Sequence, residues 1–282
     1  MHSLRFDRAL LHLGPLAAEV AVAFSHAVLA RVFPDGPLLT LLHPDRDLVP
    51  LGVCGPASDL ASLEVGDELR LEGRSLWIGR GSRWDLAGDG VSLRLPDLPF
   101  SRESLASQLP TVAAHRRQDR SALEQRALAK ADALLRHLVL DLSGARVLAG
   151  GVGVAPAVSG LIGTGFGSTP TGDDWLVGVV ALGHRMSQAG LLYRPSWEEL
   201  LAALLEAGPE ATTPVAREML RHAAVRELPE ALLRVAGLLG QSQARPDDLD
   251  AACGRLLTVG ARSGSDLLTG VLALAGAVCA AH

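Results

Sequence analysis

Lysine, cysteine and aromatic residues are all scarce in this chain of 282 residues. Lys130 is the only lysine, so arginine carries the positive charge, and a Schiff-base mechanism would have to rest on that one residue. The three cysteines, Cys54, Cys253 and Cys279, form no CxxC pair, and we expect them to be reduced thiols rather than disulfides or zinc ligands. The net charge of -5 and the lack of a basic stripe argue against a nucleic-acid partner.

Long hydrophobic runs are also missing. The N-terminus, Met1 to Arg5, lacks the charged start and the apolar segment of a signal peptide. The apolar run from Leu267 to Ala281 looks too short for a membrane span and follows an aspartate, so we interpret it as a core helix. We therefore expect a cytoplasmic protein with no membrane partner. Its 48% hydrophobic content is that of a globular protein.

Apolar residues in the first hundred positions are spaced in the manner of β-strands. Alternation over residues 19–33 favours a strand pair, although the frequent alanines leave a helix open there. Short apolar runs between turn signals predict further strands at residues 38–42, 48–53, 68–71, 75–78 and 91–95. We expect residues 1–100 to form a compact antiparallel β domain, either as an open sheet or as a small barrel.

Helix signals replace strand signals after Pro99. Capping boxes occur at Ser121 and Ser196, and Thr213 is a cap followed by proline at the first helical position. Further helices are predicted to begin at Ser101, Pro229, Pro246 and Gly264. The signal at Ser121 introduces a long amphipathic helix that we expect to reach about residue 140. We predict that residues 101–282 form a helical domain, which makes the chain α+β with a boundary near residue 100.

The most informative stretch runs from Gly163 to Leu176 and reads GTGFGSTPTGDDWL. Its glycines predict a loop, and Asp173 and Asp174 precede an apolar run that predicts a buried helix. A glycine-rich loop before a helix can present several N–H groups to one small anion. It is not a nucleotide-binding P-loop, because Asp173 stands where that motif needs lysine, and the glycine spacing does not fit a dinucleotide fingerprint.

The same pattern recurs 92 positions later, where GSDLLTGVLAL from Gly264 matches GDDWLVGVVAL from Gly172. Two such helices could pack through Gly178 and Gly270, where missing side chains let the backbones approach. Their N-termini would then lie together, with the aspartates of both loops converging. The alternative is a pair of well-capped core helices without chemistry.

We expect Asp173, Asp174 and Asp266 to be the catalytic groups. One of the two adjacent aspartates should cap the helix while the other faces the loop, and their repulsion should raise one pKa unless a cation intervenes. Magnesium is possible, but nothing in the sequence requires it, and we expect no metal site and no cofactor.

Arg262 is the only arginine beside either loop and the best candidate for contact with a small-molecule anion. The hydroxyls of Thr212 and Thr213 are either substrate contacts or simple helix caps. The predicted substrate-binding residues are Gly165, Gly167, Ser168, Thr169, Gly172, Thr212, Thr213, Arg262, Ser263 and Gly264.

The segment from Gly163 to Gly178 resembles the AllH-like family, formerly a domain of unknown function, whose motif is G-x-G-x-G-L-T-P-S-G-D-D-F-L-x-G. Ser168 stands here for leucine, Thr171 for serine and Trp175 for phenylalanine. The segment from Gly260 to Gly270 is similar to the family's second motif, G-x-T-S-G-x-D-x-L-x-G, with Arg262 in place of the threonine. Thr212 and Thr213 also look like a family T-T segment.

The resemblance implies a subunit of oxamate carbamoyltransferase, an enzyme of purine-nitrogen use that works on carbamoyl phosphate and oxamate. It therefore implies further subunits as partners, and it leaves open whether this chain is catalytic by itself. The competing hypothesis is a non-catalytic subunit that binds a small carboxylate or phosphate, or serves as a scaffold.

Overall fold

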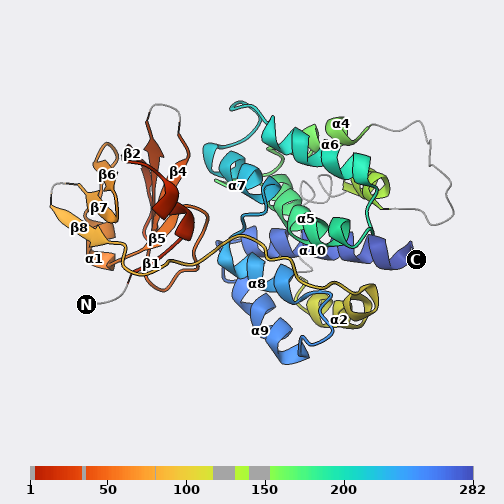
Figure 1. Cartoon of the computed structure of the whole chain (residues 1–282). Coiled ribbons are helices and arrows are strands. Elements are labelled where there is room, and N and C mark those ends of the chain that lie inside the picture. The colour runs from red at the N-terminus through yellow and green to blue at the C-terminus, as the bar shows by residue number, and fades with distance from the viewer. Residues whose placement is uncertain (1–3, 34–35, 80, 117–130, 140–152, 282) are drawn as a thin grey trace. The chain divides into compact units, whose positions relative to one another are not determined.

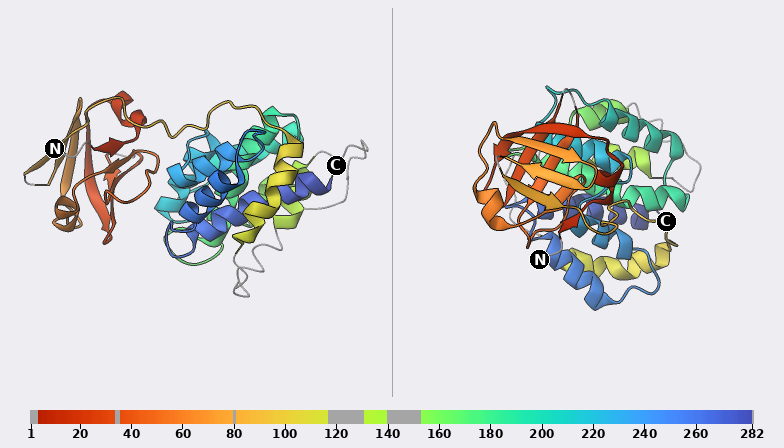
Figure 2. Two further views of the ribbon diagram at one scale, coloured as in Figure 1. Left: turned by 90° about the horizontal axis from the view of Figure 1, so that it is seen from below. Right: turned by 60° about the vertical axis from the view of Figure 1, so that its left-hand side comes forward.

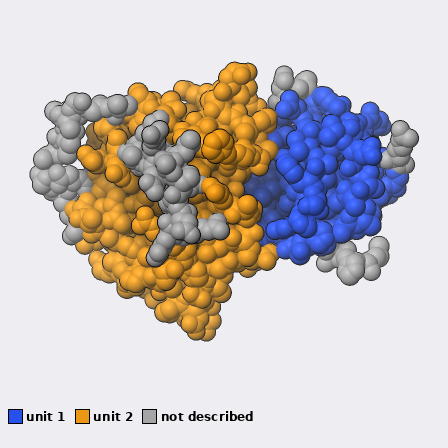
Figure 3. Space-filling model, turned by 180° about the vertical axis from the view of Figure 1, so that it is seen from behind, with its two compact units in different colours: residues 1–94, 228–230 blue, residues 95–227, 231–282 orange. Residues whose placement is uncertain are grey.

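The computed structural model describes residues 4–33, 36–79, 81–116, 131–139 and 153–281. The chain divides into two compact units, which Figure 3 colours separately. Residues 1–94 and 228–230 form the first unit, and residues 95–227 and 231–282 form the second. The first is built on a β-sheet and the second on helices, which confirms the predicted α+β class.

The first unit is a curled sheet of eight strands in the order β1-β5-β4-β3-β2-β6-β7-β8 (Figure 1). Neighbouring strands are antiparallel except β4 and β5, which run parallel. The strands are β1 (Arg5–Phe6), β2 (Leu16–Ala23), β3 (Ala27–Val32), β4 (Leu38–Leu42), β5 (Gly52–Cys54), β6 (Glu68–Glu72), β7 (Ser75–Ile78) and β8 (Ser82–Asp85). A short 3-10 helix (Arg8–His12) and α1 (Ala57–Ala61) complete this unit.

Side-chain alternation explains why these segments are strands. In β6, Leu69 and Leu71 are buried while Glu68, Arg70 and Glu72 are exposed, so one face of the strand joins a core and the other meets water. The hydrophobic core of this unit includes residues from most of the strands, among them Phe6, Val20, Val28, Leu41, Val53, Leu69, Leu76 and Trp84.

The predicted strand pair at residues 19–33 is confirmed by β2 and β3, which carry a register shift between Val20 and Val22. Two of the other strand predictions need correction. Residues 48–53 contribute a strand only from Gly52, and residues 91–95 form no strand, since Val91 makes only an isolated bridge to Asp7. The sequence did not predict β8, because Trp84 is its only buried residue and the strand shows no apolar alternation.

The second unit contains the helices α2 (Arg102–Ala114), α4 (Val154–Ser159), α5 (Thr171–Gln188), α6 (Arg194–Leu205), α7 (Pro214–Ala224), α9 (Pro246–Leu256) and α10 (Ser263–Ala280). α8 (Glu230–Leu238) belongs to it from Ala231 onward. Residues 131–138 are also helical, and the remainder of the helix predicted for residues 121–140, apart from residue 139, lies outside the described residues.

Two of the predicted helix starts show the expected caps, and a third is wrong. The Ser101 hydroxyl accepts the N–H of Ser104, and the Thr213 hydroxyl accepts the N–H of Ala216. Ser196 is not a cap, because α6 begins at Arg194 with Pro195 in its first turn.

Helix α5 is the core of the second unit, since every residue from Thr171 to Met186 is buried. It packs along α10, as Figures 1 and 2 show. The contact is backbone to backbone: a Cβ added to Gly178 would lie 2.0 Å from the Leu267 carbonyl oxygen, and one added to Gly270 would lie 2.0 Å from that of Trp175. The predicted packing through the two glycines is confirmed.

A buried arginine anchors the other end of α5. Arg185 donates hydrogen bonds to the carbonyl oxygens of Ala236 at 2.7 Å, Gly237 at 2.8 Å and Pro99 at 2.7 Å. Burial lowers the pKa of its guanidinium to about 10, which still leaves it charged at neutral pH. A cation near the last carbonyls of α8 is electrostatically favourable, so Arg185 joins α5 to the end of that helix.

Helix α10 is long and apolar enough to cross a membrane by length and composition alone, which corrects the expectation that this run is too short. Its burial identifies it instead as a core helix, because 61% of its 18 residues are covered within the structure. Among the described residues it is the one helix that meets those two criteria.

Substituting Gly178→Ala should destabilise the helical unit by about 1–3 kcal/mol or more, because the new methyl group collides with backbone that cannot rotate away. The matched control is Gly276→Ala in the partner helix α10, where an added Cβ meets nothing within 4 Å. That change should stabilise the helix by up to about 1 kcal/mol. Urea unfolding of both variants checks this, and equal stabilities would contradict the close helix contact.

Candidate functional site

The loop of residues 161–170 leads into α5 and has the left-handed backbone that its glycines predict. The φ angles are +72° at Gly163, +124° at Gly165 and +100° at Gly167. At Gly163 the requirement is also steric, since a Cβ would lie 2.2 Å from the Ala211 carbonyl oxygen. The loop is therefore pressed against the segment that precedes α7.

Three hydroxyl contacts join this loop and the first turn of α5 to the starts of two other helices. Thr169 Oγ1 and Ser263 Oγ, the latter on the first residue of α10, are 2.7 Å apart. Thr213, the N-cap of α7, donates its hydroxyl to the Ser168 carbonyl oxygen. Thr212 donates its hydroxyl to Asp173 Oδ2 at 2.7 Å. The N-termini of α5, α7 and α10 therefore meet at the loop, and each brings the positive end of a helix dipole.

Asp173 is held by partners outside its own helix. Its carboxylate accepts the Gly163 N–H at 3.1 and 3.2 Å as well as the Thr212 hydroxyl. The residue is 1% exposed, and burial raises its pKa to about 6, against the opposing effect of these hydrogen bonds. The N-cap of α5 is Pro170, without a side-chain cap, so the expectation that one aspartate caps the helix is wrong. Asp173 fastens the loop and the Thr-Thr segment together.

Asp174, unlike Asp173, is not held by hydrogen bonds among the described residues. It is also 1% exposed, yet neither of its carboxyl oxygens has a hydrogen-bond partner of normal geometry in the described part of the chain. Burial raises its pKa to about 8; the nearby hydroxyls of Ser263 and Thr169 oppose the shift, and the charges of Asp266 and Asp173 add to it. Asp174 is therefore a buried acid whose neutral form is favoured by its surroundings.

Asp266 and Arg262 lie at the start of α10. Asp266 is buried in its first turn, and its charge acts on Asp174, so the two glycine–aspartate motifs lie together as the sequence predicted. Arg262 immediately precedes the helix, is exposed, and accepts the Asp266 N–H on its carbonyl oxygen at 3.0 Å. Its side chain is therefore close to the site in sequence and open to solvent.

The predicted N–H cradle is only partly available in this conformation. Gly172 donates its N–H to the Thr164 carbonyl oxygen at 2.8 Å, and Gly264 donates to that of Val259 at 3.0 Å. Both glycines instead provide space, since a Cβ at either would lie 2.0 Å from a carbonyl oxygen, of Leu161 and Leu256 respectively. Gly165 is partly buried, and Gly167 and Ser168 are exposed at the loop surface.

The residue that the sequence argument missed is Gly163, whose N–H fixes the orientation of Asp173. Its place at the head of the glycine series was visible, but its partner was not. No group of three or more His, Cys, Asp or Glu side chains that could hold a metal occurs within the described ranges.

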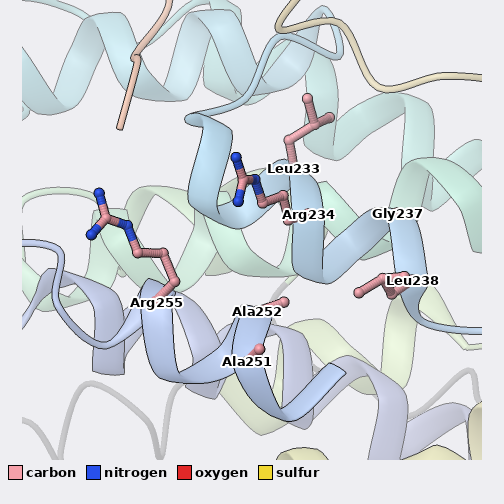
Figure 4. A pocket seen from close by; sticks show the side chains of 7 residues that line it. All are labelled: Leu233, Arg234, Gly237, Leu238, Ala251, Ala252 and Arg255. Carbon is pink, nitrogen blue, oxygen red and sulfur yellow. The ribbon is translucent and has the colours of Figure 1, made fainter. Parts of the chain in front are cut away.

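A second surface feature lies between α8 and α9, and none of the predicted site residues lines it. It is a groove of about 340 Å³ with an apolar floor that includes Leu238 and Ala252, and Arg234 and Arg255 extend beside it (Figure 4). Both arginines are exposed. They provide a useful reference for the role of positive charge at Arg262.

Replacing Thr212 by valine should lower the free energy of unfolding by about 1–3 kcal/mol, because Asp173 would lose a buried hydrogen bond. Thr258→Val is the control, since that hydroxyl, just after α9, makes an exposed hydrogen bond to the carbonyl oxygen of Arg255 in the last turn of α9, and its loss should change stability by no more than about 0.5 kcal/mol. Denaturant unfolding measures both. Equal effects would contradict a fastening role for Asp173.

Stability should fall as pH rises from about 4 to about 8. The pKa of Asp174 is raised in the folded state from 3.8 to about 8, so the folded state holds a proton that the unfolded chain has already released. One pKa unit corresponds to about 1.4 kcal/mol, so the loss should reach a few kcal/mol. Asp174→Asn should remove most of this slope in unfolding measurements between pH 5 and pH 9. An unchanged slope in the variant would assign the effect elsewhere.

The helical unit contains a segment that matches a known protein family. Residues 161–275 match the model of a protein family described as oxamate carbamoyltransferase subunit AllH. No curated protein and no solved structure matches the chain. The matched segment includes both glycine–aspartate motifs and the Thr-Thr segment, and so contains every predicted site residue. Residues 161–275 of the helical unit are therefore similar to the AllH-like family.

Proposed function

We propose that this chain is a subunit of a carbamoyltransferase assembly, and that the junction of α5, α7 and α10 binds a small carboxylate such as oxamate together with carbamoyl phosphate. The observation that carries the proposal is Asp174, a buried acid without a hydrogen-bond partner of normal geometry where three helix N-termini meet. An unsatisfied buried polar group costs about 1–3 kcal/mol, so such groups call for an explanation, and a ligand contact is one.

The electrostatics of the junction support an anionic ligand. Helix N-termini attract negative charge, and three of them point at one loop. Arg262, beside the start of α10, adds an exposed guanidinium that can bind carboxylate or phosphate in a bidentate manner. Asp174 supplies a polar group that an incoming ligand can satisfy.

Carbamoyl transfer needs little covalent chemistry from the protein. The acceptor nitrogen forms a bond to the carbamoyl carbon, the bond from that carbon to the phosphate oxygen breaks, phosphate leaves, and the nitrogen loses a proton. The protein contributes by holding the two ligands in line and by stabilising the oxyanion at the carbamoyl carbon. In this proposal Asp174 is the catalytic residue that contacts ligand, Asp266 acts through its charge on Asp174, and Asp173 is a positioning residue.

The family description names a subunit, so we propose that partner subunits complete the enzyme. The alternative is a subunit that binds the anion at the same site without catalysing transfer. No metal is required in either version, and the lack of a metal or cofactor and a cytoplasmic location stay predictions.

Calorimetric titration with oxamate, carbamoyl phosphate and phosphate tests the site. Asp174→Ala should weaken binding at least about fivefold, the equivalent of a hydrogen bond worth about 1 kcal/mol or more. Arg262→Ala should weaken it about two- to fivefold, as expected for an exposed charge. Arg255→Ala, an exposed arginine beside the other groove, should leave it unchanged.

The enzyme and its alternative are separated by turnover. The assembly, purified through a tag on this chain, should release phosphate from carbamoyl phosphate only when oxamate is present, and Asp174→Ala should abolish that release. Binding without oxamate-dependent release by the whole assembly would favour the non-catalytic subunit. Site variants that bind like the parent would refute the site in both versions.

A further inference from the structure

We propose that Asp174 binds the ligand as a neutral carboxylic acid that donates its O–H to a ligand oxyanion, so that anion binding is coupled to protonation of this residue. The inference rests on the proposed function in one respect, because it assumes that the ligand binds where the three helices begin. It goes further by assigning the protonation state of the site and the class of ligand, a small carboxylate or other oxyanion.

The first step concerns the charges around Asp174. The other charged residues in the first turns of the three helices are Asp173 on α5, Arg217 on α7 and Asp266 on α10, and Arg262 precedes α10 in solvent. After burial, which has the largest effect, the two groups whose charges raise the pKa of Asp174 are Asp266 and Asp173. Both are carboxylates, so an ionised Asp174 would be a third negative group in one enclosed space.

The second step concerns the donors. Thr212 and the Gly163 N–H are already used by Asp173, and one of the hydroxyls of Thr169 and Ser263 donates to the other, so this pair has at most one proton left to donate. An ionised Asp174 would need two or more donors to replace water, and none has the required geometry among the described residues. A neutral carboxyl instead has a proton to donate, which requires an acceptor.

The third step concerns the helix dipoles and their effect on a bound anion. Three N-termini attract an anion, whereas an ionised Asp174 would repel it. Protonation removes the repulsion and creates an O–H···O⁻ bond, one of the stronger hydrogen bonds in proteins. A cation or a ligand amide N–H would need the ionised form instead, so the two ligand classes have opposite pH dependence.

The ligand reaches Asp174 by separating the Thr169–Ser263 pair, whose hydroxyls are then free to donate to the same anion. The loop that carries Thr169 is exposed at its tip, where Phe166 is 81% exposed and a Cβ at Gly167 would meet nothing within 4 Å. Between this tip and Thr169, the Ser168 carbonyl oxygen is held by the Thr213 hydroxyl, so that bond has to lengthen when Thr169 moves.

The test is calorimetric titration of the full chain with oxamate between pH 6 and pH 9.5, in two buffers of different ionisation enthalpy. Oxamate keeps its carboxylate ionised throughout. The dissociation constant should be constant below about pH 8, the pKa of Asp174, and should rise about tenfold per pH unit above it. The difference between the buffers should show uptake approaching one proton per oxamate at the high-pH end.

Two variants isolate the residue. Asp174→Asn keeps a hydrogen-bond donor that does not titrate, so oxamate should bind with little pH dependence and no proton uptake. Asp174→Leu has no donor and should bind weakly at every pH. Asp250→Asn, the same change at an exposed carboxylate that bonds His115, should keep the pH profile of the parent.

Titration with the neutral diamide oxamide tests the opposite possibility, in which an ionised Asp174 accepts hydrogen bonds from the ligand. Affinity that rises with pH, proton release, or tighter binding of oxamide than of oxamate would show that Asp174 acts as an ionised acceptor and would overturn the inference. Oxamate binding that depends on Arg262 but not on pH would also overturn it while leaving the proposed function intact. No oxamate binding at any pH would overturn both.

Discussion

The close approach of α5 and α10 is the constraint on which the site depends. At Gly178 and Gly270 the helices meet through their backbones, with no room for even a methyl group on either side. Two helices that touch so closely, at equivalent positions six residues after Gly172 and Gly264, necessarily bring their first turns together. The contact between Thr169 and Ser263 and the effect of Asp266 on Asp174 both follow from that register.

This register has an electrostatic consequence. Aligned helix starts concentrate positive dipole ends, which favour negative charge, but the same packing excludes the water that would solvate it. These two opposing effects on a buried carboxylate have different outcomes at the adjacent residues Asp173 and Asp174. Asp173 receives donors from the loop and from Thr212, and burial raises its pKa to about 6. Asp174 receives none of normal geometry, and its pKa rises further, to about 8.

Much of this arrangement could be predicted, because it depends on local sequence patterns and on an internal repeat. The 92-residue repeat predicted both buried helices and their contact through Gly178 and Gly270, since glycine at matching positions of two apolar helices lets their backbones approach. Alternation predicted β2 and β3, and Thr213 before proline predicted the start of α7. Strands with few apolar residues were not predicted, as at β8, where Trp84 is the only buried residue.

The division of labour between the aspartates was not predictable, because it depends on residues that are distant in sequence. Nothing in the Gly-Asp-Asp tripeptide says which carboxylate will meet the N–H of Gly163 or the hydroxyl of Thr212, 39 positions later. Local reasoning assigned one of them to the helix cap, but Pro170 occupies that position and the cap is made without a side chain.

The neighbouring threonines show the same principle on the opposite side of the loop. Thr213 confirms the cap interpretation, since its hydroxyl caps α7 by accepting the Ala216 N–H, and it also donates to the Ser168 carbonyl oxygen. Thr212, one residue earlier, binds Asp173. Consecutive residues at a helix start point in different directions, so a pair of polar residues there can hold the scaffold with one side chain and address the site with the other. With Thr212, Thr213 and Asp173 all engaged in joining α5 and α7 to the loop, Asp174 is the acid of the pair that is left to meet a ligand.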